Sequence, residues 1–589
     1  MKRTIINKAC LLVMLLLIAL LLLPACGDGK SVADIKNPDT FIVATIGGPE
    51  TLDPAAAYDS ASGEVLQMVY EPLIYYDRES TTEYVPVLAD EWEISADGMT
   101  YRFHIREGVV FHNGATLTPE DVEYTFERAL VQDYVGAPTW MLYEPLFGIG
   151  TSSHLDDDTL RPLSDLTSVV EVVDGGWVEF YLASPYEPFI QILASWWGSI
   201  VDQDWCIANG DWDGTQESYE ALNNPAANEW PLDLITNGTG PFVLEYWEKA
   251  VEVSLTRNEN YWREEAPFER LLIKEVSEWT DRKLMLENGD CDYAYVPTIN
   301  YGEMEGAEGI TAYEDLPLVQ CEGFFYNFDI NPESAFIGSG QLDGAGIPTD
   351  FFSDIDVRKG FTYCFNWVSY IDEAMNGYGI QPASPVVKGI SYYNPNLDHL
   401  LYSNDMAKAE EHFKAAWGGE VWEKGFTLVL AYNSGNDTRK VASEILANNV
   451  SSLNPKFNVT AAPQDWTSYG AQQYARILPC FQVGWIPDFF DAHNFIATWM
   501  HEGGYWAYFQ SYNNPTATDL VEQGIASTDP AERQAIYDEL AQIYYDDCPG
   551  ILLVQPIGNR YFKDWVQGYY FNPANAANYG WVYDLRKTY

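Results

Sequence analysis

The alternation of apolar and polar positions is clearest over residues 88–130, where it predicts a hairpin followed by a helix. Tyr101, Phe103 and Ile105 alternate with polar neighbours, a period of two that buries one face of a strand. A second short strand is predicted over 91–94, and the Asp-Gly dipeptide between the two strands suits a tight turn. This stretch therefore begins with an antiparallel strand pair.

A helix is predicted to begin directly after Thr118. Threonine is a common helix-capping residue, Pro119 suits the first helical position, and Asp121 stands three residues after the cap. An apolar stripe at helical spacing follows it: Val122, Thr125, Phe126, Ala129 and Leu130. The turn and cap residues by themselves indicate only ordinary scaffold.

The rest of the chain carries both kinds of pattern. Helices are predicted over 65–70, 188–197, 280–288, 405–417, 438–450 and 531–545. Strands are predicted over 41–46, 169–173, 177–182, 290–293, 324–328, 426–432, 457–460, 480–485 and 551–554. The alternation beyond residue 400 implies a mixed sheet covered by helices.

The first 25 residues are interpreted as a leader. Three basic residues precede an apolar run over 9–23, which is shorter than a membrane span and typical of a secretory signal. Residues 23–26 (Leu-Pro-Ala-Cys) resemble a bacterial lipobox, which implies that Cys26 is lipidated and becomes the mature N-terminus. Residues 26–39 are polar and predict a flexible tether. An uncleaved anchor is the alternative, and either leaves the body of the chain outside the cytoplasm.

A chain of 589 residues is too long for one core, so three or four domain-sized units are expected.

The net charge argues against several classes of partner. The formal net charge of −55 argues against nucleic acid and anionic lipid headgroups, because binding phosphate needs the opposite charge. It fits a soluble external protein.

Six cysteines follow the lipobox, and none forms a C-x-x-C pair: Cys206, Cys291, Cys321, Cys364, Cys480 and Cys548. Zinc and thiol-redox functions are therefore weakly supported. An exported protein can oxidise its cysteines, and Cys291 and Cys321 are the pair to test first because both stand in strand-like segments.

The run from Trp92 to Val122, W-x-x-S-x-D-G-x-T-Y-x-F-x-x-R-x-G-V-x-F-H-x-G followed by T-P-x-D-V, resembles the signature of the family 5 extracellular solute-binding proteins. That family serves ABC importers for dipeptides, oligopeptides and, in some branches, nickel or oligosaccharides. Residues 237–242, 255–262 and 356–361 also resemble its segments. The resemblance implies an α/β, two-lobed periplasmic-binding-protein fold of type II, with an extra α/β domain inserted in the first lobe.

The same resemblance divides the chain into segments. They are a signal peptide (1–25), a tether (26–39), three segments of the first lobe (40–87, 236–326 and 554–589), the extra domain (88–235) and the second lobe (327–553).

Residues 484–491 are the most informative stretch for ligand specificity. They resemble the family's G-W-x-x-D-x-x-D segment, whose first aspartate receives the ligand's α-ammonium group in peptide-binding members. That position is Asp488. A carboxylate suits this role because it accepts charge-assisted hydrogen bonds. Gln482 stands where enteric oligopeptide binders have an arginine, so capture of a peptide's C-terminal carboxylate there is in doubt.

Further ligand contacts are expected from both lobes. The resemblance implies that Trp485 and Trp466 line the pocket with flat rings, which pack on varied side chains. Tyr58 and Asp59 would stand in a loop beside the ligand, and Arg439 would lie where a polar contact is possible.

A calcium site is the one metal hypothesis. Asn209, Asp211, Asp213 and Glu220 fall at the offsets of an EF-hand loop, although asparagine in first place and Gln216 weaken the match. A polar loop that fits by chance is the alternative. No other cofactor is expected, and the seven histidines lack the spacing of a nickel site.

The function implied is that of a monomeric lipoprotein that captures peptides, or similar amine-bearing solutes, and delivers them to the permease subunits of an ABC importer. It would be held by Cys26 on the outer face of the cell membrane or in the periplasm. An oligosaccharide ligand is the alternative, motivated by an aromatic content of 15%. A secreted hydrolase is disfavoured because the sequence lacks G-x-S-x-G, H-E-x-x-H and phosphate-loop motifs, although Asp488 and Asp491 could imitate a glycosidase pair.

Overall fold

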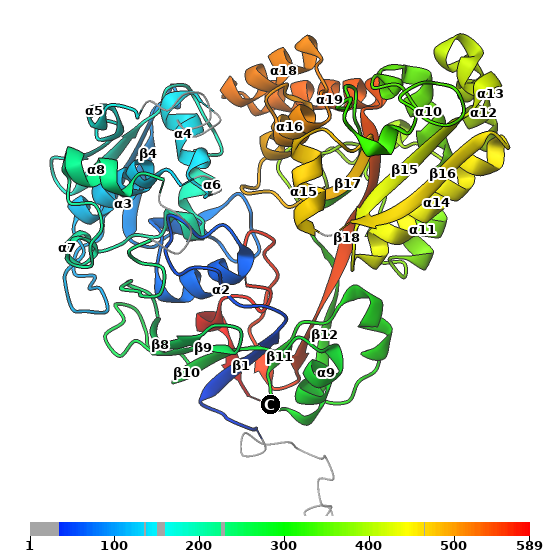
Figure 1. Cartoon of the computed structure of the whole chain (residues 1–589). Coiled ribbons are helices and arrows are strands. Elements are labelled where there is room, and N and C mark those ends of the chain that lie inside the picture. Colours follow the sequence, from blue (N-terminus) through cyan, green and yellow to red (C-terminus); the bar gives the residue numbers. More distant parts are fainter. Residues whose placement is uncertain are drawn as a thin grey trace, which may run out of the picture.

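The computed structural model describes residues 35–134, 137–149, 160–224, 230–464, 466–575 and 577–588, without the side chains of 466 and 467. Two lobes are joined by one ten-stranded sheet, and an extra domain lies beside the first lobe (Figure 1). Eight of the ten strands follow the order β17 (Cys480–Trp485), β13 (Cys321–Tyr326), β18 (Gly550–Lys563), β11 (Tyr293–Ala294), β1 (Thr40–Thr45), β10 (Arg270–Glu275), β9 (Glu252–Arg257) and β8 (Phe242–Glu248), and the other two pair with β18. The two-lobed α/β fold expected from the sequence is confirmed.

The strand β18 connects the lobes. Its first residues pair with β13, and its later residues pair with β12 (Ile310–Pro317) and β11. In Figure 1 it is the long red strand that runs from the second lobe into the first. β14 (Gly379–Ile380) pairs with the middle of β18, between these two regions. The lobes therefore share a continuous backbone element.

The first lobe is built from both ends of the chain. β1 lies between β10 and β11 and pairs with both in parallel, while α2 (Ser60–Val69) and α9 (Trp279–Asn288) pack nearby. Lys587 near the C-terminus places its Nζ 2.8 Å from Asp292 Oδ2, and the same oxygen accepts a hydrogen bond from Ile42 N at 2.7 Å. Residues 42, 292 and 587 thus meet at one buried carboxylate.

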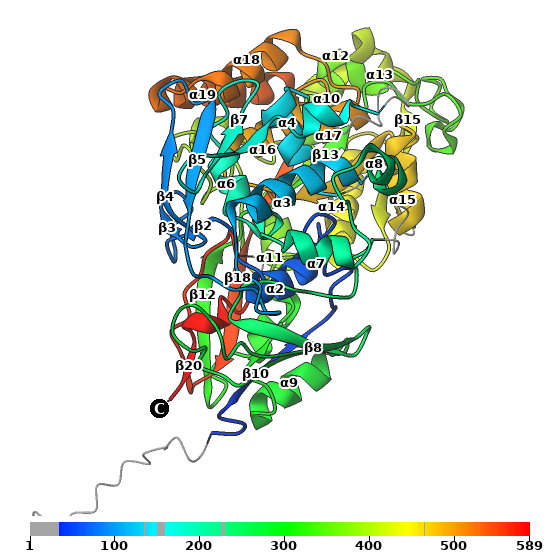
Figure 2. The same ribbon diagram turned by 90° about the vertical axis from the view of Figure 1, so that its left-hand side faces the viewer.

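The extra domain contains a separate antiparallel sheet of order β4 (Ala89–Ile94), β5 (Thr100–Ile105), β7 (Trp177–Tyr181) and β6 (Val170–Val173). Figure 2 faces this domain and shows α3 (Pro119–Gln132) beside the sheet. The Thr118–Asp121 capping box begins α3 as the sequence predicts. The apolar stripe of α3 meets the sheet where the rings of Phe126 and Phe180 pack 4.9 Å apart. The remaining helices of the domain are α4 (Trp140–Phe147), α5 (Leu163–Leu166), α6 (Phe189–Leu193), α7 (Gln203–Ala208) and α8 (Gln216–Leu222).

The second lobe holds a parallel strand pair, β15 (Phe426–Asn433) and β16 (Phe457–Gln464), covered by helices. Its helices are α10 (Ile355–Cys364), α11 (Trp367–Glu373), α12 (Met406–Ala415), α13 (Glu420–Lys424), α14 (Asp437–Leu453), α15 (Trp466–Tyr474), α16 (Ala492–Met500), α17 (Tyr505–Phe509), α18 (Pro515–Ala526) and α19 (Pro530–Asp547). Shorter strand pairs, β2 (Ile74–Tyr76) with β3 (Tyr84–Pro86) and β19 (Val566–Gln567) with β20 (Arg586–Lys587), complete the fold.

Several local predictions need correction. The strand predicted over 551–554 extends to Lys563, and the helix predicted over 65–70 already begins at Ser60. The strand predicted over 290–293 is reduced to the two residues of β11. The proposed Cys291–Cys321 disulfide is wrong, because all six cysteines of the described chain are free and buried. In the described ranges, no helix is both long and apolar enough to cross a membrane.

Candidate ligand-binding site

The loop that follows β17 carries Asp488 to the boundary between the lobes. β17 ends at Trp485, and α16 begins at Ala492 with Asp491 as its cap, whose side chain accepts from His493 N. Asp491 also forms an ion pair with the buried Arg533, with Oδ1 and Nη2 2.7 Å apart. The two aspartates of the motif thus have different roles. Asp491 fixes the loop by capping α16 and pairing with Arg533, and Asp488 takes part in neither contact.

Asp488 receives two hydrogen bonds from side chains. Tyr58 donates its hydroxyl to Oδ1 at 2.7 Å, and Asn494 donates Nδ2 to Oδ2 at 3.1 Å. Burial raises the pKa of Asp488 to about 6, although both hydrogen bonds lower it. Burial and the neighbouring Asp488 charge raise the pKa of Tyr58 well above its usual range, so its hydroxyl stays a neutral donor.

Asn494 forms hydrogen bonds with both Trp485 and Asp488, two of the predicted ligand contacts. Its Oδ1 accepts from Trp485 Nε1 at 2.7 Å and from Asp488 N at 3.2 Å. Asn494 is buried in the first turn of α16. The sequence analysis did not identify this residue, and the only signal available was its place three residues after the second aspartate of the motif.

The extra domain also reaches this point. Trp140, the first residue of α4, donates Nε1 to the Tyr58 hydroxyl at 3.0 Å, and its ring lies 6.2 Å from that of Phe489. The ring of Trp197 lies 6.1 Å from Tyr58. Tyr58 is therefore the residue at which the first lobe, the extra domain and the second lobe meet.

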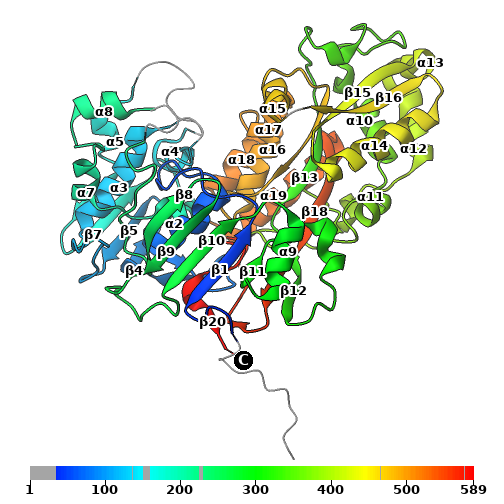
Figure 3. The same ribbon diagram turned by 60° about the horizontal axis from the view of Figure 1, so that its bottom comes forward.

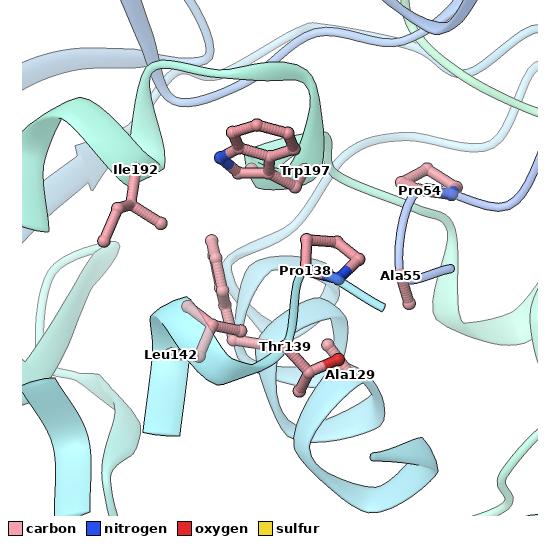
Figure 4. A pocket seen from close by; sticks show the side chains of 10 residues that line it. Pro54, Ala55, Ala129, Pro138, Thr139, Leu142, Ile192 and Trp197 are labelled. Carbon is pink, nitrogen blue, oxygen red and sulfur yellow. The ribbon is translucent and has the colours of Figure 1, made fainter. Parts of the chain in front are cut away.

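A small apolar pocket lies beside Tyr58, between the extra domain and the loop after β1 (Figure 4). Its lining is formed by Pro54, Ala55, Phe126, Ala129, Pro138, Thr139, Leu142, Ile192, Trp197 and Gly198. None of these side chains ionises, so the pocket offers packing surface and the charge at this meeting point comes from Asp488.

Two other predicted contacts are already engaged within the protein. Asp59 caps α2, where its carboxylate accepts from Ser62 N at 2.8 Å. Arg439 in the first turn of α14 pairs with Glu322, with Nη2 and Oε2 3.2 Å apart, and donates Nη1 to Asn433 at 2.9 Å. Tyr58 and Asp488 are thus brought together. The side chains of Asp59 and Arg439 instead bond to neighbouring residues of the protein.

Two further predicted residues cannot be placed in the site. Trp466 begins α15, but its side chain lies outside the described part of the chain. Cys26 lies outside the described residues together with the leader. Their roles stay predictions.

The four residues of the calcium hypothesis take part in helix ends and in an ion pair. Asn209 ends α7 and donates Nδ2 to Trp205 O. Asp211 is buried against Arg128, with Oδ2 and Nε 2.5 Å apart. Asp213 accepts from Thr215 and Ser218 at the start of α8, and Glu220 accepts from Gln216 on that helix (distances 3.0, 2.5 and 3.1 Å). Across the described ranges, acidic, histidine and cysteine side chains form no group of three that could hold a metal ion.

Ion pairs also join the extra domain to the second lobe near Asp488. Glu187 forms an ion pair with Arg533 and accepts the Tyr392 hydroxyl at 2.7 Å. Glu144 of α4 lies 3.2 Å from His493 Nε2. The two arginines around the Asp488 loop, Arg439 and Arg533, and the neighbouring His493 therefore each face a carboxylate of the protein itself.

A comparison with known protein families assigns the chain to a family. Residues 83–507 match the family described as bacterial extracellular solute-binding proteins, family 5 (middle). The chain belongs to the family 5 extracellular solute-binding proteins. The resemblance seen in the signature stretch is thereby confirmed, and with it a solute-binding role outside the cytoplasm.

Individual relatives cover nearly the whole chain. The heme-binding protein A of Haemophilus influenzae is 23% identical over 94% of this chain and 95% of its own length. The dipeptide-binding protein of Escherichia coli K12 is 24% identical over 93% and 95%. The solved structure of the ABC transporter-associated periplasmic binding protein DppA from Helicobacter pylori, in complex with the peptide STSA, superposes with a TM-score of 0.69 and 20% identity over 93% of this chain and 98% of that one.

These matches identify a solute-binding family and not an enzyme family. The chain is a solute-binding protein of this family. The named relatives differ in ligand, so membership of the family leaves the choice of solute to the residues of this particular site.

Proposed function

We propose that this solute-binding protein captures peptides, or similar solutes that carry a free amino group, between its two lobes, and delivers them to an ABC permease. The observation that supports this is the carboxylate of Asp488 at the lobe boundary. It is held by neutral donors, Tyr58 and Asn494, and among the described residues no cation is bonded to its negative charge. An ammonium group of the ligand supplies the missing positive charge.

The setting of Asp488 differs from that of the other acids around it. Asp491, Glu322, Glu187 and Glu144 each face an arginine or histidine side chain. A half-buried carboxylate without such a partner has a raised pKa and gains most from a ligand that brings a cation. This difference supports Asp488 as the proposed anionic contact for the ligand.

The site offers no comparable charged partner for a ligand's carboxylate at the two positions considered, Arg439 and Gln482. Arg439 is committed to Glu322 and Asn433, and Gln482 is a buried neutral residue whose Oε1 is 3.3 Å from Ser443 Oγ. The amino end of the ligand is thus fixed more firmly than the carboxyl end, which favours peptides of varied length over a zwitterion of one size.

The membrane attachment belongs to the same proposal. Lipidation of Cys26 would hold the protein at the outer face of the membrane, and the segment 26–39 would act as the tether, so that a monomer can reach the permease. Replacement of Cys26 by serine should release the protein into the medium or the periplasm, whereas retention in the membrane fraction would contradict the lipid anchor.

Calorimetry with a matched panel tests the ligand class. The panel consists of short peptides with a free amino group, the same peptides N-acetylated, and cello-oligosaccharides. Binding of the free peptides alone supports the proposal. Binding of the oligosaccharides alone would support the alternative motivated by the aromatic content, and equal binding of free and acetylated peptides would remove Asp488 as the ammonium contact.

A further inference from the structure

A group of aromatic rings continues from the Asp488 loop along one side of the second lobe. Trp485 and Tyr505 have ring centroids 6.0 Å apart, Tyr505 and Phe509 4.6 Å, and Phe509 and Tyr474 5.6 Å. These four rings, called the aromatic strip below, come from the end of β17, from α17 and from the end of α15. A line of rings in tilted and edge-to-face contact thus begins next to the proposed ammonium contact.

The outer rings of the aromatic strip are unusually open to solvent. Tyr505 is 53% exposed and Tyr474 is 67% exposed, whereas Phe509 beneath them is buried. Large apolar side chains that gather on a surface mark a binding site more often than rings that are exposed singly. The buried Phe509 and the neighbouring Trp506, whose ring lies 4.7 Å from Tyr505, hold the exposed rings in place.

The aromatic strip faces the other half of the molecule. Its first ring, Trp485, is linked through Asn494 to Asp488, which accepts the hydroxyl of Tyr58 from the first lobe. Figure 3 shows α15, α16 and α17 on the side of the second lobe that is turned toward α4 of the extra domain. A solute held by Asp488 would therefore extend along these rings.

We infer that the aromatic strip is a specificity subsite, and that it selects peptides with an aromatic side chain at one of the first two residues after the free amino group. The inference rests on the proposed function. Trp485 and Asp488 share Asn494 as a hydrogen-bond partner, so the first ring lies beside the ammonium contact. One residue of extended peptide spans about 3.4 Å, which places the first or second side chain over Trp485 and Tyr505.

Ring stacking gives the expected size of the preference. An aromatic pair of this kind corresponds to an affinity gain of about three- to tenfold. The aromatic strip would add this gain through ring geometry, whereas a purely apolar surface would reward any side chain of the same area.

Calorimetry of the full chain with three tripeptides tests this subsite: Ala-Ala-Ala, Phe-Ala-Ala and Ala-Phe-Ala. We expect one of the two phenylalanine peptides to bind the wild type about three- to tenfold more tightly than trialanine. Tyr505→Ser should abolish that preference and leave the affinity for trialanine within about twofold, and Tyr505→Phe should restore the preference.

Tyr508→Ser is the matched control. Tyr508 stands on the same helix and is 49% exposed, but Arg476 covers its ring at 4.7 Å from the centroid. This variant should keep the preference for the aromatic peptide. Loss of preference in both serine variants, or none in the wild type, would overturn the inference alone. Failure of all three peptides to bind the wild type would overturn the proposed function and the inference together.

Discussion

The hydroxyl of Tyr58 donates a hydrogen bond to Asp488 Oδ1 at 2.7 Å, although 430 positions separate the two residues in the chain. Tyr58 precedes α2 in the first lobe, and Asp488 follows β17 in the second. The contact that joins the lobes and the contact proposed for the ligand therefore use the same carboxylate. Under the proposed function, ligand binding and lobe closure are linked through it, because a ligand that prefers the joined state stabilises that state.

Replacement of Asp488 by asparagine should remove the charge while keeping the shape of the side chain. Charge-assisted hydrogen bonds contribute about 1.5–3 kcal/mol, so the affinity for peptides with a free amino group should fall about ten- to a hundredfold. Calorimetry with the same peptides N-acetylated is the control, because their affinity should not change. An unchanged affinity for the free peptides would contradict the ammonium contact.

The pH dependence of binding should follow the pKa of Asp488, which burial raises to about 6. The carboxylate is ionised above this value and protonated below it. Affinity should therefore be highest between pH 6 and the pKa of the peptide's amino group, about 8, and fall about tenfold for each pH unit below 6. The Asp488→Asn variant should lack the low-pH fall, and an equal fall in wild type and variant would assign it to another group.

Tyr58→Phe tests the bond between the lobes. The hydrogen bond from Tyr58 lowers the pKa of Asp488, so its loss should raise that pKa further and move the midpoint of binding upward in pH. Affinity measured from pH 5 to pH 8 reports this midpoint. A merely structural effect of the substitution would weaken binding equally at every pH, and this result would separate the two explanations.

Substitutions of Glu187 and Asp491 should differ sharply in their effect on stability, although both residues pair with Arg533. Glu187 is 48% exposed, so Glu187→Gln should cost only about 0.5–1 kcal/mol and speed ligand release by about two- to fivefold. Asp491 and Arg533 are buried, so Asp491→Asn should lower the free energy of unfolding by about 3–5 kcal/mol while keeping an oxygen to cap α16. Stopped-flow release and denaturant unfolding measure the two effects, and equal destabilisation would contradict the difference in burial.

Calcium should leave the melting temperature unchanged. Asp211 is occupied by Arg128, and the other three residues of the proposed loop take part in helix ends. A titration to about 10 mM calcium exceeds the dissociation constants of extracellular calcium sites and should shift the melting temperature by less than about 1 °C. A larger rise that magnesium does not reproduce would re-establish the calcium loop.

Elements that rest on local signals could be predicted from the sequence. The strand over 480–485 has the same bounds in the structure, because an apolar run between loop residues defines it. The helix after Thr118 begins where its capping box stands. In such cases the side chains that determine the structure are neighbours in the chain, so their spacing contains the information.

The second half of β18 could not be predicted, because its stabilising partners are distant. Pro556, Gly558 and Arg560 make this stretch look like a loop. In the structure Gln555 donates to the carbonyls of Leu318 and Lys388, and Arg560 donates to Asn578 at 2.6 Å. Polar residues are buried here only because other segments supply their hydrogen bonds.

The candidate site was predicted in part. Asp488, Trp485 and Tyr58 were identified from the family resemblance, and the structure brings them together around Asn494. Asp59 was expected beside the ligand, yet its carboxylate caps α2. An aspartate in the sequence can serve either as a helix cap or as a ligand contact. Only the position of the neighbouring backbone N–H groups decides which role it takes.

The meeting of Ile42, Asp292 and Lys587 at one buried carboxylate restricts how the chain can fold. The first lobe contains the earliest and the latest strands of the described chain, so it cannot be completed until almost the entire chain is available for folding. The extra domain, whose strands and helices are contiguous in sequence, can fold much earlier. The first lobe is therefore the last part to be completed, and a truncation of the last few residues should damage this lobe first.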